Sequence, residues 1–362
     1  MNRAKGYTSH LKIAVLSLAD INNYGDMFFP YIFRLELQSR LPTAKIDLYT
    51  NMQYHCDIYD TAEYSRNRLL DYNAVILAGG DTVQRLDEEN WKDIYPSDIG
   101  KKRPSDIIFD WLDLDKPYKA YFSVGVHPQM QEYRQDVLSA ISRLDYLAVR
   151  GVLSKKILEG AIISNNNKIR IVPDLGWLFN RYIDVLEKET EGFCVPSKPY
   201  MVFEIFYEFD EEVLRFAART LQQFQSETGV EVMLLPIVHT KSRKQLSTWN
   251  DYYPLSRIAE YTDNALTLMP DQLSAAEVGI LLKNAKFYLG SSMHGARTRA
   301  DCFINHWGRL PEFLRKLDKE AEEKNEKKYS IMYADYMRYR LSTELDELCR
   351  QICEKQRIGF YE

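Results

Sequence analysis

Short apolar runs alternate with amphipathic stretches along the first half of the chain. Several of these runs are continuous rather than alternating in polarity, which is typical of strands that are buried on both faces. The predicted strands are Lys12 to Leu18, Ile46 to Tyr49, Ala74 to Leu77, Tyr118 to Val126, Tyr146 to Val149 and Arg170 to Val172. The predicted helices lie near Phe28 to Leu41, Ser105 to Leu112, Glu132 to Leu144 and Val152 to Leu158. This alternation predicts a mostly parallel sheet with helices on both faces.

The pattern pauses and then repeats in the second half. Gly192, Pro196 and Pro199 indicate a linker over Lys188 to Pro199. The next predicted strands are Tyr200 to Ile205, Val230 to Ile237, Ala265 to Met269 and Phe287 to Leu289, and the helices between them lie near Glu211 to Ser226, Pro254 to Tyr261 and Ser274 to Asn284. Glu312 to Lys328 and Ile331 to Arg357 are expected to be charged helices. Their apolar residues either pack back across the domains, which we favour, or meet a second subunit.

The predicted fold class is therefore α/β, with two Rossmann-like domains that face one another across a cleft and with helices at the C-terminus. The N-terminal domain is expected over residues 1–190, the second over 191–310, and a helical extension over 311–362. In folds of this kind, ligands bind at the carboxyl ends of the strands.

Composition narrows the classes of partner. A formal net charge of −5 argues against nucleic-acid binding. Met1 to His10 lacks the apolar core of a signal peptide, and no run is long enough for a membrane span, so we expect a cytoplasmic protein. A peripheral contact with a membrane stays open, as does the oligomeric state. The five cysteines are scattered and indicate neither a disulfide framework nor a metal site.

The first candidate site is the turn after the strand Phe287 to Leu289. It contains Ser291, Ser292, His294 and Gly295 and opens a predicted helix. An imidazole beside backbone N–H groups and a helix N-terminus suits the binding of a phosphate or carboxylate together with proton transfer. The alternative is a structural histidine at a strand end.

Two further candidates follow strands of the first half. Asn23, Gly25 and Asp26 come after the first strand, where Asp26 can cap a helix or accept a proton from a hydroxyl group. Gly79 and Gly80 follow the strand Ala74 to Leu77, and their lack of a side chain lets the backbone approach a ligand.

Arg150 also ends a strand, and Ser154 follows four residues later. A guanidinium at this position can bind a carboxylate or phosphate with two hydrogen bonds. The alternative is that Arg150 pairs with an aspartate of its own domain. Asp174, in Val172-Pro173-Asp174, fits either a capping or salt-bridging role or catalysis.

The order of these motifs resembles the polysaccharide pyruvyl transferase family: Asn-Tyr-Gly-Asp, Gly-Gly-Asp, Val-Arg with a serine four residues on, Val-Pro-Asp, and Ser-Ser-Met-His-Gly. The resemblance covers roughly Leu11 to Asp301 and implies a fold similar to the GT-B glycosyltransferases. It also implies an enzyme that transfers the enolpyruvyl group of phosphoenolpyruvate onto two hydroxyls of a sugar, as a ketal, in surface polysaccharide biosynthesis. The donor is then a substrate, and no cofactor or metal is expected.

The resemblance implies that Arg150 binds an anionic group of the donor and that His294 acts at the reacting centre. Asn23, Gly25 and Asp26 would line the opposing wall. The chemistry of the donor adds Arg297 as a further cation, and it makes His294 and Asp26 the candidate proton carriers. The acceptor would be a sugar or a lipid-linked oligosaccharide.

Two departures from the family pattern keep other functions open. Ser292 stands where the family often has arginine, and Asp301-Cys302-Phe303-Ile304-Asn305-His306 replaces an expected Gly-Ile-Pro. The alternatives are a glycosyltransferase that uses a nucleotide sugar and a non-catalytic member of the fold.

Overall fold

The computed structural model describes residues 11–55, 58–84, 104–128, 130, 139–161, 169–189, 193–205, 210–238, 250–299, 302–303, 307–320 and 324–357. The chain divides into two compact units. Unit 1 comprises Met1–Asp20, Gly25–Leu175 and Tyr336–Glu362, and unit 2 comprises Ile21–Tyr24 and Gly176–Asp335. The main passage from unit 1 to unit 2 lies between residues 175 and 176, whereas the sequence pattern predicted a boundary at residue 190. Residues 336–362 return to unit 1.

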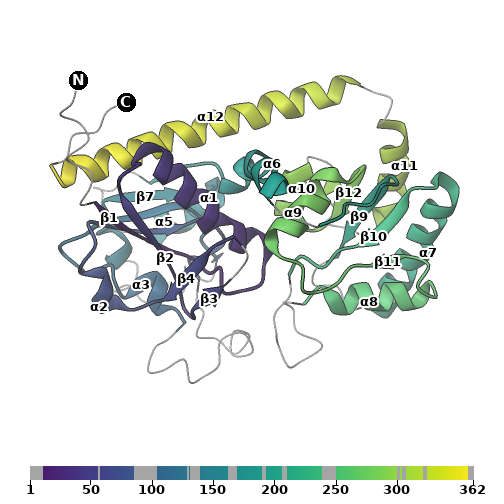
Figure 1. Cartoon of the computed structure of the whole chain (residues 1–362), viewed down its shortest axis with the longest axis horizontal. Coiled ribbons are helices and arrows are strands. Elements are labelled where there is room, and N and C mark those ends of the chain that lie inside the picture. Colours follow the sequence, from purple (N-terminus) through teal and green to yellow (C-terminus); the bar gives the residue numbers. More distant parts are fainter. Residues whose placement is uncertain are drawn as a thin grey trace. The chain divides into compact units, whose positions relative to one another are not determined.

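Unit 1 is built on an eight-stranded sheet in the order β3-β4-β2-β1-β5-β6-β7-β8 (Figure 1). The strands are β1 (Lys12–Leu16), β2 (Lys45–Thr50), β3 (Tyr54–His55), β4 (Asp60–Glu63), β5 (Ala74–Ala78), β6 (Tyr118–Val124), β7 (Tyr146–Val149) and β8 (Arg170–Ile171). Neighbouring strands are parallel except for the β3–β4 pair. Every residue of β5, β6 and β7 is buried. Helices therefore cover both faces of the central strands.

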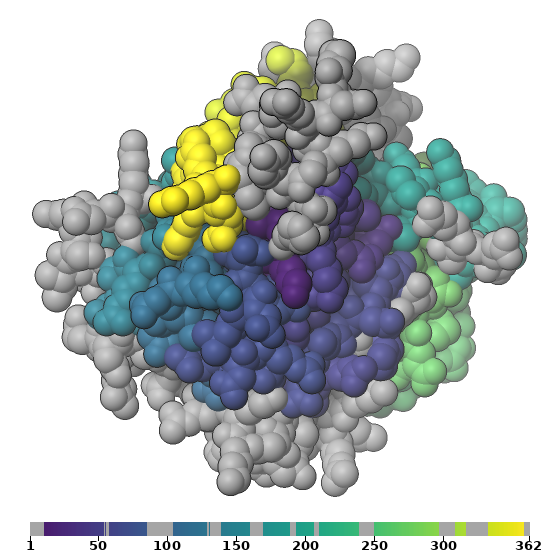
Figure 2. Space-filling model, turned by 60° about the vertical axis from the view of Figure 1, so that its left-hand side comes forward, coloured from purple at the N-terminus to yellow at the C-terminus, as the bar shows by residue number. Residues whose placement is uncertain are grey.

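The helices of unit 1 are α1 (Tyr24–Arg40), α2 (Arg66–Leu69), α3 (Asp106–Phe109), α5 (Val152–Ala161) and the C-terminal part of α12 (Lys324–Lys355). This part of α12 packs on unit 1 through buried residues that include Leu341, Leu345, Leu348 and Ile352. Arg40 anchors it through an ion pair with Asp346, and Figure 2 shows the end of α12 in yellow against the purple and blue surface of unit 1. This half of α12 therefore packs back on unit 1, as predicted for the C-terminal helices.

Unit 2 has a five-stranded, fully parallel sheet in the order β11-β10-β9-β12-β13. Its strands are β9 (Tyr200–Glu204), β10 (Glu231–Leu234), β11 (Thr267–Leu268), β12 (Phe287–Gly290) and β13 (Cys302–Phe303). The helical elements are η3 (Leu175–Leu178), α6 (Phe179–Glu189), α7 (Glu211–Thr228), α8 (Tyr252–Tyr261), α9 (Ala275–Asn284), α10 (Met293–Arg299), η4 (Trp307–Arg309) and α11 (Leu310–Glu320).

Local signals explain where the helices of unit 2 begin and end. The carboxylate of Asp210 accepts a hydrogen bond from the backbone N–H of Glu212 at the start of α7, and Gly229 ends that helix with φ +67°. Ser274 and Glu277 form a capping box at the start of α9. On the core side, α7 buries Leu214, Ala217 and Leu221 among other residues, so that the sheet and the helices share one apolar core.

The predicted α/β class is confirmed, with parallel sheets in both units. All ten predicted strands are present, in several cases shortened by one or more residues at their ends. The sequence pattern missed the strands β3, β4 and β13, the helices α2 and α6, and the short helical elements η3 and η4. Most of the predicted helix Glu132 to Leu144 lies outside the described residues.

Candidate functional site

Arg150 is the centre of a charged cluster at the carboxyl edge of the sheet in unit 1. It follows β7, and its guanidinium lies 3.3 Å from Asp174 Oδ2 and 3.3 Å from Asp81 Oδ1. The side chain of Asp174 is 1% exposed, whereas that of Asp81 is 51% exposed. The cluster thus has a buried side and an open side. Arg150 pairs with aspartates of its own unit, which is the alternative that the sequence left open for it.

Asp26 is the third carboxyl group of this cluster. Burial raises its pKa to about 7, Arg150 acts in the opposite direction, and Asp81 and Asp174 add to the rise. Burial opposes the charge of Arg150, but Asp174 and Asp81 more than offset this effect, so its pKa is raised as well. A guanidinium that stays charged therefore lies near a carboxyl group that gains or loses its proton close to neutral pH.

Glycines make room for this cluster. Gly79 and Gly80 both have φ +71°, a left-handed backbone conformation that favours glycine. A β carbon at Gly79 would lie 2.8 Å from Cγ of Phe29, and one at Gly80 would lie 2.7 Å from Oδ1 of Asp26. At Gly125, a β carbon would overlap with Asp81 and lie 2.7 Å from Nε of Arg150. These glycines let the chain's own side chains approach; their contact with a ligand stays a prediction.

Ser154 and Ser123 hold the loops beside Arg150. The hydroxyl of Ser154, on α5, accepts a hydrogen bond from the backbone N–H of Val126 at 3.0 Å. Ser123, near the end of β6, has φ 57° and donates its hydroxyl to the carbonyl of Pro173 at 2.9 Å. A non-glycine residue in this conformation is strained and needs such support. Ser154 therefore has a structural contact, and its contact with a ligand stays a prediction.

The first motif is divided between the two units. Asn23 and Tyr24 belong to unit 2, and Gly25 and Asp26 belong to unit 1. In unit 2, Asn23 forms an isolated β-bridge with Val238.

An aromatic series in unit 2 leads from this motif to His294. The ring of Tyr24 meets that of Phe179 edge-on, with centroids 5.5 Å apart. Phe179 in turn lies 5.8 Å from the imidazole of His294, at an interplanar angle of 30°. Phe179 thus supports one face of the imidazole.

The turn before His294 is held by a carboxylate of the protein itself. Glu204 ends β9, the strand next to β12, and its Oε2 accepts hydrogen bonds from the backbone N–H groups of Ser291 at 2.9 Å and Ser292 at 2.8 Å. The hydroxyl of Ser291 also donates to Glu204 Oε1 at 3.2 Å. The sequence pattern predicted that these N–H groups are open to an anionic ligand. The structure shows instead that they are already bound.

The glycines of this turn are explained by Tyr288. A β carbon at Gly290 would lie 2.5 Å from the hydroxyl oxygen of Tyr288 and 2.7 Å from Glu204 Oε2. A β carbon at Gly295 would overlap with the same hydroxyl. The turn can therefore close over Tyr288 and Glu204 only with glycine at both positions.

Glu204 has a second buried carboxyl group near it, that of Asp251. Asp251 Oδ2 accepts hydrogen bonds from the backbone N–H groups of Ile237 at 3.2 Å and Val238 at 2.9 Å. Burial raises the pKa of Glu204 to about 7. Burial, and then the charge of Glu204, raise the pKa of Asp251 well above its usual range. Glu204 receives more hydrogen-bond donors, so it ionises first and Asp251 keeps its proton.

Arg297, the remaining predicted site residue, lies in α10, and its side chain is outside the described residues. The helix α10 has seven residues. Ser292 accepts a hydrogen bond from the backbone N–H of Gly295 at 3.2 Å through its hydroxyl, which begins this helix.

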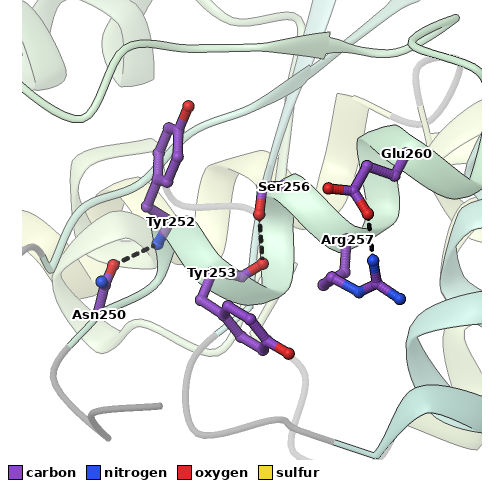
Figure 3. A pocket seen from close by; sticks show the side chains of 6 residues that line it. All are labelled: Asn250, Tyr252, Tyr253, Ser256, Arg257 and Glu260. Carbon is purple, nitrogen blue, oxygen red and sulfur yellow. Dashed lines mark hydrogen bonds and ion pairs between the residues drawn. The ribbon is translucent and has the colours of Figure 1, made fainter. Parts of the chain in front are cut away.

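A pocket of about 360 Å³ lies on α8 (Figure 3). Figure 3 shows that its polar groups bind one another: Ser256 donates to the carbonyl of Tyr253, and Arg257 pairs with Glu260. The rings of Tyr252 and Tyr253 point in opposite directions. No residue predicted for the site lines this pocket.

Sequence reasoning did not assign site roles to Asp81, Glu204, Tyr288 and Asp251. Glu204 had a detectable signal, because it is an acidic residue in the otherwise apolar run Tyr200 to Ile205. Carboxylates in such runs are almost never fully buried without hydrogen-bond partners. Asp251 had no comparable signal, since its partners come from a different loop.

Within the described part of the chain, no group of three or more His, Cys, Asp and Glu residues is arranged to hold a metal ion. In the same residues, no helix has the length and apolarity to cross a membrane.

Comparison with known proteins identifies solved structures that share the fold of this chain. Two solved UDP-N-acetylglucosamine 2-epimerases share the fold. One, from Methanocaldococcus jannaschii, has 12% identity and a TM-score of 0.54, with 87% of this chain and 93% of that chain covered. The other, a putative enzyme from Listeria monocytogenes, has 10% identity and a TM-score of 0.51, with 97% and 98% covered.

A glycosyltransferase from Rickettsia africae ESF-5 has 9% identity and a TM-score of 0.50, with 94% and 98% covered. These likenesses confirm the GT-B type of fold. A search of curated proteins finds no match. The family profile of polysaccharide pyruvyl transferase matches residues 23–296, a span that runs from Asn23 of the first motif past His294 and covers more than half of the chain. The chain therefore belongs to the polysaccharide pyruvyl transferase family.

Proposed function

We propose that this protein transfers the enolpyruvyl group of phosphoenolpyruvate onto a glycan to form a pyruvate ketal, in the biosynthesis of a surface polysaccharide. The observation that carries the proposal is Asp26, a carboxyl group with a pKa of about 7 beside Arg150 at the carboxyl edge of a parallel sheet. Membership of the family supports the reaction class.

The reaction requires two proton acceptors and one proton donor. Each of two sugar hydroxyls gives up a proton and forms a C–O bond to C2 of the donor. The methylene carbon gains one proton and becomes a methyl group, the bond from C2 to the phosphate oxygen breaks, and the phosphate leaves with the second proton. A general base works best when its pKa is close to the working pH, as that of Asp26 is.

The charges around Arg150 favour the sugar acceptor, rather than phosphoenolpyruvate, as the ligand of the cluster formed by Asp26, Asp81, Arg150 and Asp174. The guanidinium of Arg150 is already matched by Asp174 and Asp81. A donor with about three negative charges would compete with both carboxylates for it. Neutral sugar hydroxyls, by contrast, can donate hydrogen bonds to these carboxylates. We therefore propose Asp26 as the base that accepts a proton from an acceptor hydroxyl.

His294 is proposed as the proton donor to the methylene carbon. Phe179 supports its ring, and the turn that carries it is fixed by Glu204. An imidazole is a side chain that can supply a proton in this kind of step.

The test is turnover of phosphoenolpyruvate with a panel of oligosaccharide acceptors that carry adjacent hydroxyl pairs. Phosphate release and the mass gain of one pyruvate ketal on the acceptor are the expected results. Calorimetric titration with phosphoenolpyruvate, UDP, GDP and CMP runs in parallel. Binding of a nucleotide without binding or turnover of phosphoenolpyruvate would overturn the proposal in favour of a glycosyltransferase.

The Asp26→Asn variant tests the proposed base. It should lose activity by about 10²- to 10⁴-fold, the usual contribution of general acid–base catalysis. Asp110→Asn is the matched control, because burial also raises the pKa of Asp110 to about 7, and its carboxylate accepts a hydrogen bond from Tyr64 away from Arg150. Equal losses in the two variants would rule out a specific role of Asp26.

A further inference from the structure

The turn at residues 290–295 is held by buried side chains that have no part in the bond-making and proton-transfer steps of the proposed reaction. Glu204 Oε2 accepts both the Ser291 and the Ser292 N–H groups, and Tyr288 donates its hydroxyl to the same oxygen at 3.2 Å. Glu204 is 0% exposed. The carboxylate thus accepts these hydrogen bonds without contact with solvent, whereas Ser291 and Ser292 are half-buried.

This arrangement changes what the turn can do with a ligand. An N–H group that already donates to a buried carboxylate is not available to a phosphate, and a second anion near Glu204 would be repelled. Recognition at this turn then has to come from side chains such as that of His294. The backbone N–H groups of Ser291 and Ser292 serve to fix the turn.

We propose that Glu204 is a positioning residue that fixes the turn from Gly290 to Gly295 and so presents the imidazole of His294 for the reaction. The role in catalysis rests on the proposed function, whereas the effect on the His294 environment does not. The anchor connects two neighbouring parallel strands, because Glu204 ends β9 and Gly290 ends β12, and these residues are partners in register.

The geometry predicts different outcomes for two replacements of Glu204. Glutamine keeps an oxygen that can accept the two backbone N–H groups, and its amide NH₂ can donate to the Ser291 hydroxyl, which now donates to Oε1. Alanine leaves these two half-buried N–H groups without the acceptor that holds them, which is costly. The turn should therefore hold in Glu204→Gln and relax in Glu204→Ala.

The experiment measures kcat, KM and the NMR titration of His294 in wild type, Glu204→Gln and Glu204→Ala. Glu204→Ala should lower kcat by roughly 10- to 100-fold, since a shift of about 1 Å in a catalytic group has an effect of this size. Its KM for the acceptor should stay within about twofold, because the charge cluster of unit 1 is untouched. The His294 resonances should shift in this variant. Glu204→Gln should restore both kcat and the resonances.

Two controls separate positioning from general stability. Glu231→Ala removes another glutamate of the same sheet, one that accepts the hydroxyl of Thr267 at 2.8 Å, and it should leave kcat and the His294 resonances unchanged. Tyr288→Phe removes one donor to Glu204 but keeps both backbone bonds, so its effect should be smaller than that of Glu204→Ala. If Glu204→Ala fails to fold, Glu204→Leu and Glu204→Gln provide the same comparison.

The outcomes are distinguishable from failure of the proposed function. If wild type does not turn over phosphoenolpyruvate, the reaction is wrong, and the NMR comparison still tests the positioning role. His294 resonances that stay unchanged in every Glu204 variant would overturn that role. Glu204→Gln behaving like Glu204→Ala would also overturn it, because the carboxylate would then act through its charge rather than as an acceptor that fixes the turn.

Discussion

Gly80 leaves room for the carboxylate of Asp26, because a β carbon at position 80 would lie 2.7 Å from Asp26 Oδ1. The backbone of Gly80 also has φ +71°. Both features oppose any side chain at this position. The Gly-Gly turn after β5 therefore serves to seat the proposed base, which links a backbone conformation directly to the chemistry of the cluster.

Replacement of Gly80 by alanine should lower the free energy of unfolding by about 1–3 kcal/mol, the usual cost of a left-handed conformation in a non-glycine residue. It should also lower activity, since Asp26 has to move. The matched control is Gly151→Ala, because a β carbon at Gly151 meets nothing within 4 Å. Urea unfolding and phosphate release are the measurements. Equal behaviour of the two variants would contradict the role assigned to Gly80.

The activity of the wild type should rise with pH through about 7. A base acts only when it is ionised, and the pKa of Asp26 is raised to about 7 by burial. The pH dependence of kcat/KM should therefore show an acid limb near this value. The limb should persist in Asp110→Asn, although the pKa of Asp110 is raised to a similar value. If the acid limb disappears in Asp110→Asn, the titration belongs to Asp110 and the assignment to Asp26 is wrong.

Most of the central strands could be predicted from the sequence, and the reason is physical. Strands β5 and β7 are buried throughout and appear as continuous apolar runs, and β1 and β6 do so apart from Lys12, Lys119 and Ser123. Strands β3 and β4 lie at the edge of the sheet and carry polar residues, so they give no such run. The helix α6 follows η3 without a break, and therefore no capping residue marks its start.

The candidate site could be located from the sequence only in part. The motifs around Asp26, Arg150 and His294 all lie at the carboxyl ends of strands, as the pattern predicted. What they touch could not be predicted, because Arg150–Asp174 and Glu204–Ser292 join residues far apart in the chain. Sequence spacing carries no information on such pairs. The roles of these residues toward a substrate stay predictions.

Asp26 should also affect stability in a pH-dependent way. Its pKa is about 7 in the folded protein, whereas the ordinary pKa of an aspartate is 3.8, so between these values the folded state holds a proton that the unfolded state has released. The free energy of unfolding from this group is therefore greatest at low pH and falls as the pH rises toward 7. Asp26→Asn should flatten this part of the curve. Urea unfolding of wild type and variant across this pH range measures it, and parallel curves would contradict the assignment.

Asp251 should have a similar effect. Burial and the charge of Glu204 raise its pKa well above 3.8, so its stabilising effect is fully present below 3.8 and is lost as the pH rises through the pKa of the folded protein. Asp251→Asn keeps an oxygen for the N–H groups of Ile237 and Val238. This variant should be more stable than wild type at alkaline pH and should keep its activity. Loss of activity would show that Asp251 takes part in positioning the His294 turn.

Arg150 should contribute more to stability than an exposed arginine with as many partners. Its removal leaves the carboxylate of Asp174, 1% exposed, without its cation. Breaking a buried ion pair in this way costs about 3–5 kcal/mol. Arg257 is the matched comparison, because it pairs with Glu211 and Glu260 at half-exposed positions. Arg257→Ala should cost much less, because solvent screens ion pairs at exposed positions.

The same variant distinguishes between the two roles considered for Arg150. If Arg150 mainly holds the carboxylates, Arg150→Ala raises the pKa of Asp26, because the largest effect that opposes burial is removed. The acid limb of kcat/KM then moves to higher pH, while the binding of phosphoenolpyruvate changes little. If Arg150 binds the donor, calorimetry shows affinity reduced by roughly tenfold or more, about 1.4 kcal/mol. The charge balance of the cluster favours the first result, since Asp81 and Asp174 already match the guanidinium.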